Sequence, residues 1–115
     1  MNVLAPIVVF TYNRPEHTLR TLNALLINPL ANESDIIIYS DSARTENHNK
    51  AVDEVRSYLS DLTGFRSIKV IHRDENFGLA ESIIQGVTEV LQRSEKVIVL
   101  EDDMVVSPYF LEYMN

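Results

Sequence analysis

The chain has 115 residues, 45% of them hydrophobic and 23% charged, which predicts one globular domain, residues 1–115, and excludes disordered and collagen-like classes. Because it contains no Cys, a disulfide framework, a thiolate zinc site and a cysteine nucleophile are excluded, and any metal would be bound by oxygen or imidazole nitrogen atoms. The 17 acidic and 10 basic residues give a formal net charge of -7, which disfavours nucleic acid as a partner.

Short apolar runs alternate along the chain with segments of helical periodicity. Continuous apolar runs rich in β-branched residues predict buried strands at residues 6–11, 35–40, 67–72 and 96–100. Apolar residues at helical spacing predict helices between Pro15 and Asn28, from Ala51 to Leu62 and from Leu79 to Leu91. Gly64 is expected to end the second helix, and Gly78 to provide a permissive backbone at a loop-to-helix turn.

This alternation predicts an α/β fold, a Rossmann-like three-layer sandwich. Right-handed crossovers place about four parallel strands in one sheet, with helices on both of its faces. Ligands of such sheets bind outside the carboxyl ends of the strands. The segments expected to carry function are therefore residues 11–14, 41–44, 72–78 and 101–103.

Three consecutive carboxylates, Glu101-Asp102-Asp103, follow the last predicted strand. Packing at a sheet edge does not require adjacent like charges, so a cation is expected nearby. Mg²⁺ and Mn²⁺ take oxygen ligands, commonly a pair of carboxylates together with substrate phosphates. The alternative is a solvated acidic turn in which Asp102 or Asp103 caps the next segment.

Three segments, in order along the chain, carry a resemblance to a known family. Residues 101–113 resemble the segment around the metal-binding acidic motif of GT-A nucleotide-sugar glycosyltransferases, most closely the N-acetylglucosaminyltransferase I type. Residues 6–15 resemble the opening strand and loop of that family and of the inverting family 2. Residues 76–80, Asn-Phe-Gly-Leu-Ala, are similar to the Asn-x-Gly-x-Ala element that family 2 places before its third helix. The resemblance implies the N-terminal part of a GT-A fold, with strand order 3-2-1-4.

The resemblance also implies roles for the acidic residues and their neighbours. Asp103 would bind a metal, Mn²⁺ or Mg²⁺, directly, while Asp102 would lie beside the ribose or reach the metal through water. Glu101 would be structural. Arg14 and Arg73 stand where family members place cations near the base or the phosphates. Arg14 could instead belong only to a first helical turn, and Arg73 could pair with the acids that follow it.

At the base, the resemblance implies that Asp41 accepts a hydrogen bond from the uracil imide. Tyr12 or the backbone around Thr11 would pack on the base. The alternatives are that Asp41 stabilises only its own turn and that Tyr12 is an ordinary half-buried aromatic. The histidines at positions 17, 48 and 72 lack metal-ligand spacing and are interpreted as surface or strand-end residues.

The leading hypothesis is the donor-binding portion of an inverting, metal-dependent glycosyltransferase. Its expected partners are a nucleotide-sugar donor, a UDP-sugar, and a saccharide or other hydroxyl acceptor in the full-length protein. No catalytic base is found, since that residue is expected downstream in the acceptor-binding half, so the chain alone is expected to be inactive. The alternative is a non-catalytic α/β fragment or interaction domain. A phosphoacceptor receiver and a nucleotidyltransferase fit less well, since the first predicted strand is followed by neither an acid pair nor a glycine-rich loop.

The last predicted strand, residues 96–100, would lie at the edge of the sheet in the implied strand order. An apolar edge strand is a template for association, so a homodimer through this edge or through the surface around residues 104–110 is expected. No apolar run approaches the roughly 20 residues of a membrane span, and the start of the chain lacks a signal-peptide pattern. The expected location is cytoplasmic, with no membrane span in this chain.

Overall fold

The computed structural model describes residues 4–115 and confirms the predicted α/β fold. Its strands are β1 (Ile7–Thr11), β2 (Asp35–Ser40), β3 (Ser67–His72) and β4 (Ile98–Glu101). Its α-helices are α1 (Pro15–Leu26), α2 (Asn49–Ser60), α3 (Leu79–Leu91) and α4 (Phe110–Met114), and η1 (Ala31–Glu33) and η2 (Glu46–His48) are single 3-10 turns. The strands form a parallel sheet of order β3-β2-β1-β4, as predicted, whereas η1, η2 and α4 were not anticipated.

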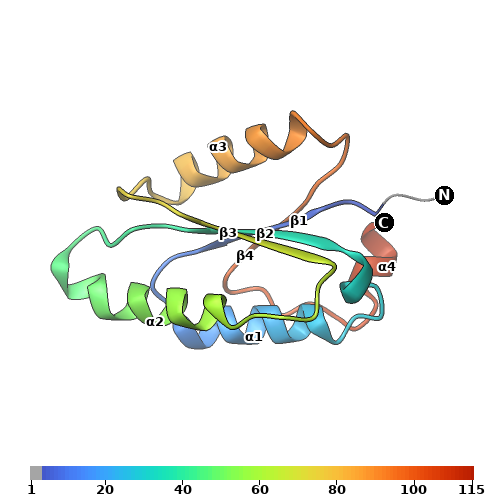
Figure 1. The fold of residues 1–115 in the computed structure, drawn as a ribbon, viewed down its shortest axis with the longest axis horizontal. Helices are drawn as coiled ribbons and strands as arrows, with labels where there is room; N and C mark the ends of the chain where they lie inside the picture. Colours follow the sequence, from blue (N-terminus) through green and yellow to red (C-terminus); the bar gives the residue numbers. More distant parts are fainter. Residues whose placement is uncertain (1–3) are drawn as a thin grey trace.

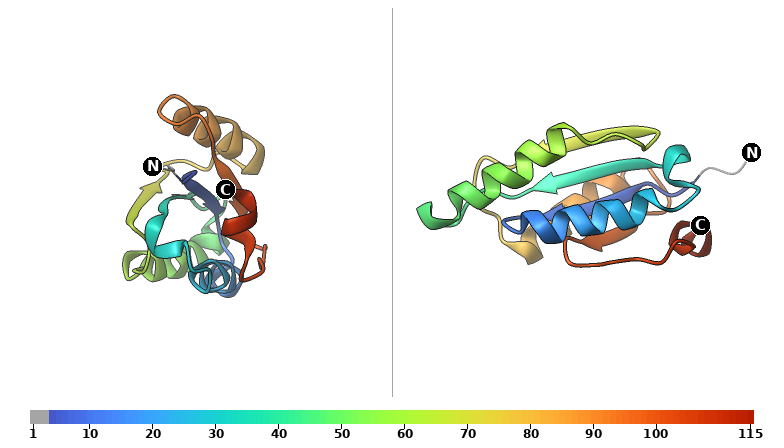
Figure 2. Two further views of the ribbon diagram at one scale, coloured as in Figure 1. Left: turned by 90° about the vertical axis from the view of Figure 1, so that its right-hand side faces the viewer. Right: turned by 90° about the horizontal axis from the view of Figure 1, so that it is seen from below.

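Helices cover both faces of the sheet and make three layers. Helices α1 and α2 lie on one face, while α3 lies on the other (Figure 1). Seen from below, α1 and α2 run beside each other under the strands (Figure 2). This arrangement leaves the carboxyl ends of the strands at one end of the sheet, next to the start of α3.

Strand β1 divides the hydrophobic core into two clusters. All of its residues are buried, and successive side chains point to opposite faces of the sheet. Ile7 and Val9 belong to the larger cluster, which includes the apolar residues of α1 and α2. Val8 and Phe10 belong to a smaller cluster that includes Val90 of α3. Because β1 is buried on both faces of the sheet, its sequence has to be apolar without interruption.

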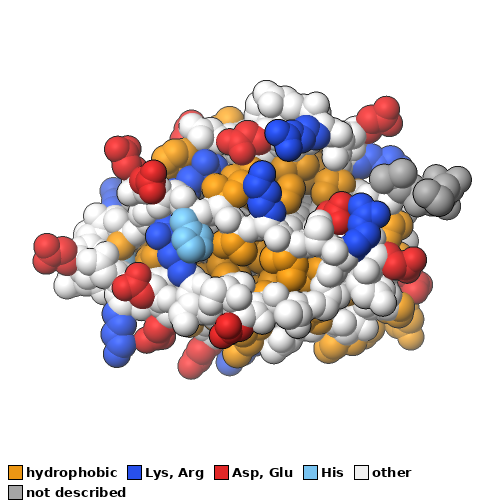
Figure 3. Space-filling model, viewed as in Figure 1, with side chains coloured by type: hydrophobic (Ala, Val, Ile, Leu, Met, Phe, Trp, Pro, Cys, Tyr) orange, Lys and Arg blue, Asp and Glu red, His pale blue; other side chains and the backbone are white. Residues whose placement is uncertain are grey.

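The buried face of α3 differs from the predicted apolar stripe. Its buried residues are Ser82, Gly86 and Val90, whereas Ile84, one of the apolar residues whose spacing predicted this helix, is 61% exposed. The cause is close packing at Gly86, where a Cβ atom would lie 2.7 Å from the ring of Phe10. Small residues therefore face the sheet, and larger apolar side chains such as Ile84 reach the surface. In Figure 3, hydrophobic side chains gather in the middle of the visible face, between α3 and the helices on the other side of the sheet.

Of the two predictions made for glycines, one is confirmed and the other is wrong. Gly78 precedes α3 with φ +79°, the permissive conformation predicted for it. The prediction that Gly64 ends the second helix is wrong, because α2 ends at Ser60. Gly64, with φ +106°, lies instead in the turn that leads into β3. A left-handed turn is needed there to reverse the chain.

The segment after β4 is anchored beneath α1 by a buried asparagine. The side chain of Asn28, at the end of α1, accepts a hydrogen bond from the Leu111 backbone N–H (2.9 Å) and donates to the carbonyl of Ser107 (3.2 Å). Leu111 is fully buried as a result. Within residues 4–115, no helix combines the length and apolar character that crossing a membrane requires.

Candidate functional site

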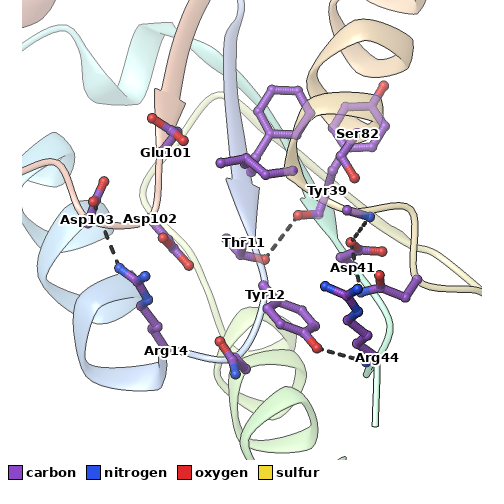
Figure 4. A pocket seen from close by; sticks show the side chains of 15 residues that line it. Thr11, Tyr12, Arg14, Tyr39, Asp41, Arg44, Ser82, Glu101, Asp102 and Asp103 are labelled. Atoms are coloured by element: carbon purple, nitrogen blue, oxygen red, sulfur yellow. Dashed lines mark hydrogen bonds and ion pairs between the residues drawn. The ribbon is translucent and has the colours of Figure 1, made fainter. Parts of the chain in front are cut away.

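A cavity of about 310 Å³ opens at the carboxyl ends of β1, β2 and β4, beside the start of α3 (Figure 4). The side chains around it come from these elements and the loops that follow them: Phe10, Thr11, Tyr12, Asn13, Arg14, Tyr39, Asp41, Arg44, Asn76, Gly78, Leu79, Ser82, Glu101, Asp102 and Asp103. The structure thus brings together the residues predicted for the site, with the exception of Arg73. These residues lie close together because the strands are parallel, so the carboxyl ends of the strands lie at the same edge of the sheet.

One side of the cavity is charged. Arg14 Nη1 lies 3.9 Å from Asp103 Oδ2, and both side chains are about half exposed. The pKa of the Asp102 carboxyl is raised, mainly by burial, although Arg14 and a hydrogen bond from the Tyr12 backbone oppose the shift. The Thr21 hydroxyl of α1 donates to the Asp102 carbonyl (3.0 Å) and holds the turn in place. Arg14 therefore provides a positive charge beside the acidic turn, while the predicted metal ion stays a prediction.

The carboxylates of Asp102 and Asp103 could provide some, but not all, of the ligands that a hard divalent cation needs. Among residues 4–115, no cluster of three or more His, Cys, Asp or Glu side chains is arranged to hold a metal ion. Asp103 and Asp102 both line the cavity and offer oxygen ligands of the kind that Mg²⁺ and Mn²⁺ prefer. The remaining ligands would have to come from water and from a substrate phosphate, which is common for Mg²⁺.

The Asp41 carboxylate occupies the opposite side and is already fully hydrogen-bonded. Its Oδ1 accepts from the backbone N–H groups of Ser42 (3.0 Å) and Phe77 (2.9 Å), and its Oδ2 from the N–H of Gly78 (3.0 Å) and the side-chain amide of Asn76 (3.3 Å). Asp41 is 6% exposed. The carboxylate therefore stabilises its own turn through Ser42, which was one of the alternatives predicted from the sequence, and it also fixes the loop before α3, which was not predicted.

Arg56 of α2 supports the same region from below. Its guanidinium donates to the side chain and carbonyl of Ser40, at the end of β2 (2.9 and 3.0 Å), and to the carbonyl of Arg73, after β3 (3.0 Å). The Ser42 hydroxyl also donates to the Arg73 carbonyl. The ends of β2 and β3 are thus tied together by a cation that the sequence analysis did not single out.

Tyr12 is joined to the loop that follows β2. Its hydroxyl accepts a hydrogen bond from the Arg44 backbone N–H (2.8 Å) and lies 2.8 Å from Nδ1 of His48. Arg44 lines the cavity as a second cation besides Arg14. It belongs to residues 41–44, a segment expected to carry function, although no individual role was predicted for it. These contacts hold the Tyr12 ring at the mouth of the cavity, where a packing role on a ligand stays a prediction.

The inner wall near Asp41 is aromatic. The rings of Phe10 and Tyr39 are stacked, with centroids 5.3 Å apart, and the Thr11 hydroxyl donates to the Tyr39 carbonyl (3.0 Å). The Arg73 guanidinium lies between the rings of Tyr39 (4.6 Å) and Phe77 (4.4 Å). Its predicted contact with a ligand therefore gains no support from the cavity lining, and the aromatic rings give Arg73 a packing role instead.

Comparisons with known proteins agree with this fold. The family model for glycosyl transferase family 2 matches residues 7–114. The crystal structure of S. aureus TarS is similar in fold, with a TM-score of 0.51 and 18% sequence identity over 85% of this chain. The chain spans 16% of the length of the TarS chain. No curated protein matches the chain significantly.

The Asp41 contacts predict an unequal loss of stability. Replacing Asp41 with Ala removes the acceptor of three backbone N–H groups, so Asp41→Ala should lower the free energy of unfolding by about 3 kcal/mol. Asn76→Ala removes only donors, to Asp41 and to the Ser42 carbonyl, and should cost about 1 kcal/mol. Urea unfolding of both variants measures the difference, and equal losses would contradict the structural role of Asp41.

Proposed function

Because the chain belongs to glycosyl transferase family 2, we propose that it forms the donor-binding part of an inverting, metal-dependent glycosyltransferase that uses a UDP-sugar. One observation carries this proposal: the cavity at the strand ends has an aromatic, hydrogen-bonding side and a charged side, separated by the end of β1. A nucleotide diphosphate has the same two parts, a flat base and an anionic diphosphate. The activity, acceptor and cytoplasmic location of the whole protein stay proposals.

The charged side is assigned to the diphosphate. Arg14 supplies positive charge there, and Asp103 would hold a divalent cation with Asp102 beside it. Arg44 lies across the end of β1, near Asp41 and Tyr12 (Figure 4). When bound, such a cation stabilises the negative charge that develops on the leaving diphosphate. Arg14 is already the counter-ion of Asp103, so a cation that takes its place would leave the guanidinium available to a phosphate oxygen.

The aromatic side is assigned to the base. Thr11 and Tyr12 border it, and Asp41 would accept a hydrogen bond from the uracil imide N–H. Because the carboxylate already has four donors, the imide would join them or displace the amide of Asn76, whose bond of 3.3 Å is the longest of the four. Arg73 would act on the base only indirectly, through the Tyr39 ring on which it lies.

Self-association is a separate proposal. Strand β4 is at the edge of the sheet and pairs with β1 within the described residues. Val99 on this strand is 37% exposed, and Val105 and Tyr109 in the following segment are more exposed still. Unpaired backbone groups and apolar side chains favour association of an edge strand, so a homodimer through β4 or through residues 104–110 stays our prediction.

The metal assignment predicts that UDP binding depends on a divalent cation. Because Asp103 would share that cation with the diphosphate, the affinity for UDP should be about tenfold higher in the presence of Mn²⁺ than in the presence of a chelator. Asp103→Asn should remove this dependence and leave the fold intact. Asp53→Asn, the same change on the exposed face of α2, should retain it. Titration calorimetry decides the matter: equal affinities of the native chain in Mn²⁺ and in chelator would disprove the metal site.

The base assignment predicts preference for uridine over cytidine. Cytosine N3 carries no proton to donate to Asp41, so CDP should bind about tenfold more weakly than UDP. In Asp41→Asn the preference should shrink, because the new amide can donate to cytosine N3 while the side chain keeps its shape. Competition between the two nucleotides measures the ratio, with circular dichroism confirming that the variant is folded. A native chain that binds UDP and CDP equally would reject Asp41 as the residue that reads the base.

A further inference from the structure

Ser82 of α3 lines the cavity, and its hydroxyl has no hydrogen-bond partner among residues 4–115. The side chain is only 5% exposed, so water does not readily replace the missing partner. A buried hydroxyl without a partner is unfavourable and uncommon in folded proteins. Alanine would avoid the unpaired group and has a higher helix propensity. Stability alone therefore does not account for serine at this position.

Ser82 lies on the side of the cavity assigned to the base. Figure 4 shows it near Tyr39 and Asp41, across the end of β1 from Asp102 and Asp103. Hydrogen bonds connect it to Asp41 through one residue. The Ser82 backbone N–H donates to the Gly78 carbonyl (3.0 Å), and the Gly78 N–H donates to Asp41 Oδ2 (3.0 Å). The hydroxyl and the carboxylate are thus separated by a single turn at the start of α3.

We propose that the Ser82 hydroxyl donates a hydrogen bond to a carbonyl oxygen of the donor's nucleobase. This inference rests on the proposed function. Uracil carries a carbonyl on each side of its imide N–H, so an acceptor on the protein and a donor next to it match that edge of the base. Asp41 supplies the acceptor and Ser82 the donor. Cytosine carries no proton at N3, so the preference for uracil rests on Asp41, and Ser82 adds affinity for the base.

Little movement is needed for this contact. The Ser82 side chain borders the cavity, while its oxygen is turned into the packing and has almost no accessible surface. Rotation about χ1 between staggered positions moves the oxygen without moving the backbone. The hydroxyl loses no hydrogen bond within the described chain when it turns, so binding the base gains a partner at no cost in existing contacts.

The test compares UDP with inorganic pyrophosphate, both in Mn²⁺, on the native 115-residue chain and on Ser82→Ala. Loss of one hydrogen bond to the base should weaken UDP binding about tenfold and leave pyrophosphate binding unchanged, because pyrophosphate carries no base. The thermal midpoint of the free Ser82→Ala protein should be equal or higher, since an unpaired buried hydroxyl is removed. A merely structural serine would lower the midpoint and would affect both ligands.

Thr18→Val provides a matched control. Thr18 on α1 is fully buried, and its hydroxyl likewise has no partner in the described residues, but it does not line the cavity. Its replacement should leave UDP affinity unchanged. If native protein binds UDP and Ser82→Ala binds it equally well, or if Ser82→Ala loses UDP and pyrophosphate binding equally, the inference is wrong and the proposed function stands. A native chain that binds no UDP overturns both.

Discussion

The position of β1 in the sheet determines most of this structure. The strand is buried along its whole length and pairs in parallel with β2 on one side and β4 on the other. In this register Thr11 lies opposite Ser40, and Phe10 opposite Glu101, so the three chain segments leave the sheet at the same edge. The loop after β1 is therefore flanked by Asp41 and by the acidic turn. A cavity with two chemically different sides follows from this pairing.

Asp41 shows that one residue can serve both the site and the stability of the fold. Its carboxylate organises the loop before α3 and so determines where that helix begins. A carboxylate with backbone N–H donors on both oxygens is held in one orientation, and a ligand meets it without further ordering. Arg56 strengthens the same corner by joining the ends of β2 and β3. The base side of the cavity is thus rigidly supported, whereas the ion pair of Arg14 and Asp103 on the other side is half exposed.

Much of the fold could be predicted from the sequence, because continuous apolar strands, helical periodicity and strand ends rich in polar residues are local signals. The bounds of β2 and β3 match the predicted ranges, and the predicted strand order is confirmed. The orientation of α3 could not be predicted, because it depends on a contact between Gly86 and the distant ring of Phe10. The sequence pattern favoured large apolar residues such as Ile84 for that face.

The candidate site likewise combines features that the sequence indicated with features that only the folded structure shows. Position after a strand was enough to indicate the acidic turn and Asp41. Three of the four hydrogen-bond donors to Asp41, however, come from a loop 35 to 37 positions away. Ser82 gave no local signal other than a serine on a mostly apolar helix. Its importance depends on what lies across from it, which only the folded chain shows.

Mapping backbone amide chemical shifts during titration with UDP and Mg²⁺ tests the central claim most directly, because it locates the ligand without a mutation. If UDP binds in the cavity at the strand ends, the largest changes fall in residues 11–14, 41–44, 76–82 and 101–103. Changes concentrated instead around Ile37, Lys69 and Arg93, which line a second cavity between α3 and strands β2 and β3, would contradict that claim. So would a spectrum that UDP and Mg²⁺ leave unchanged.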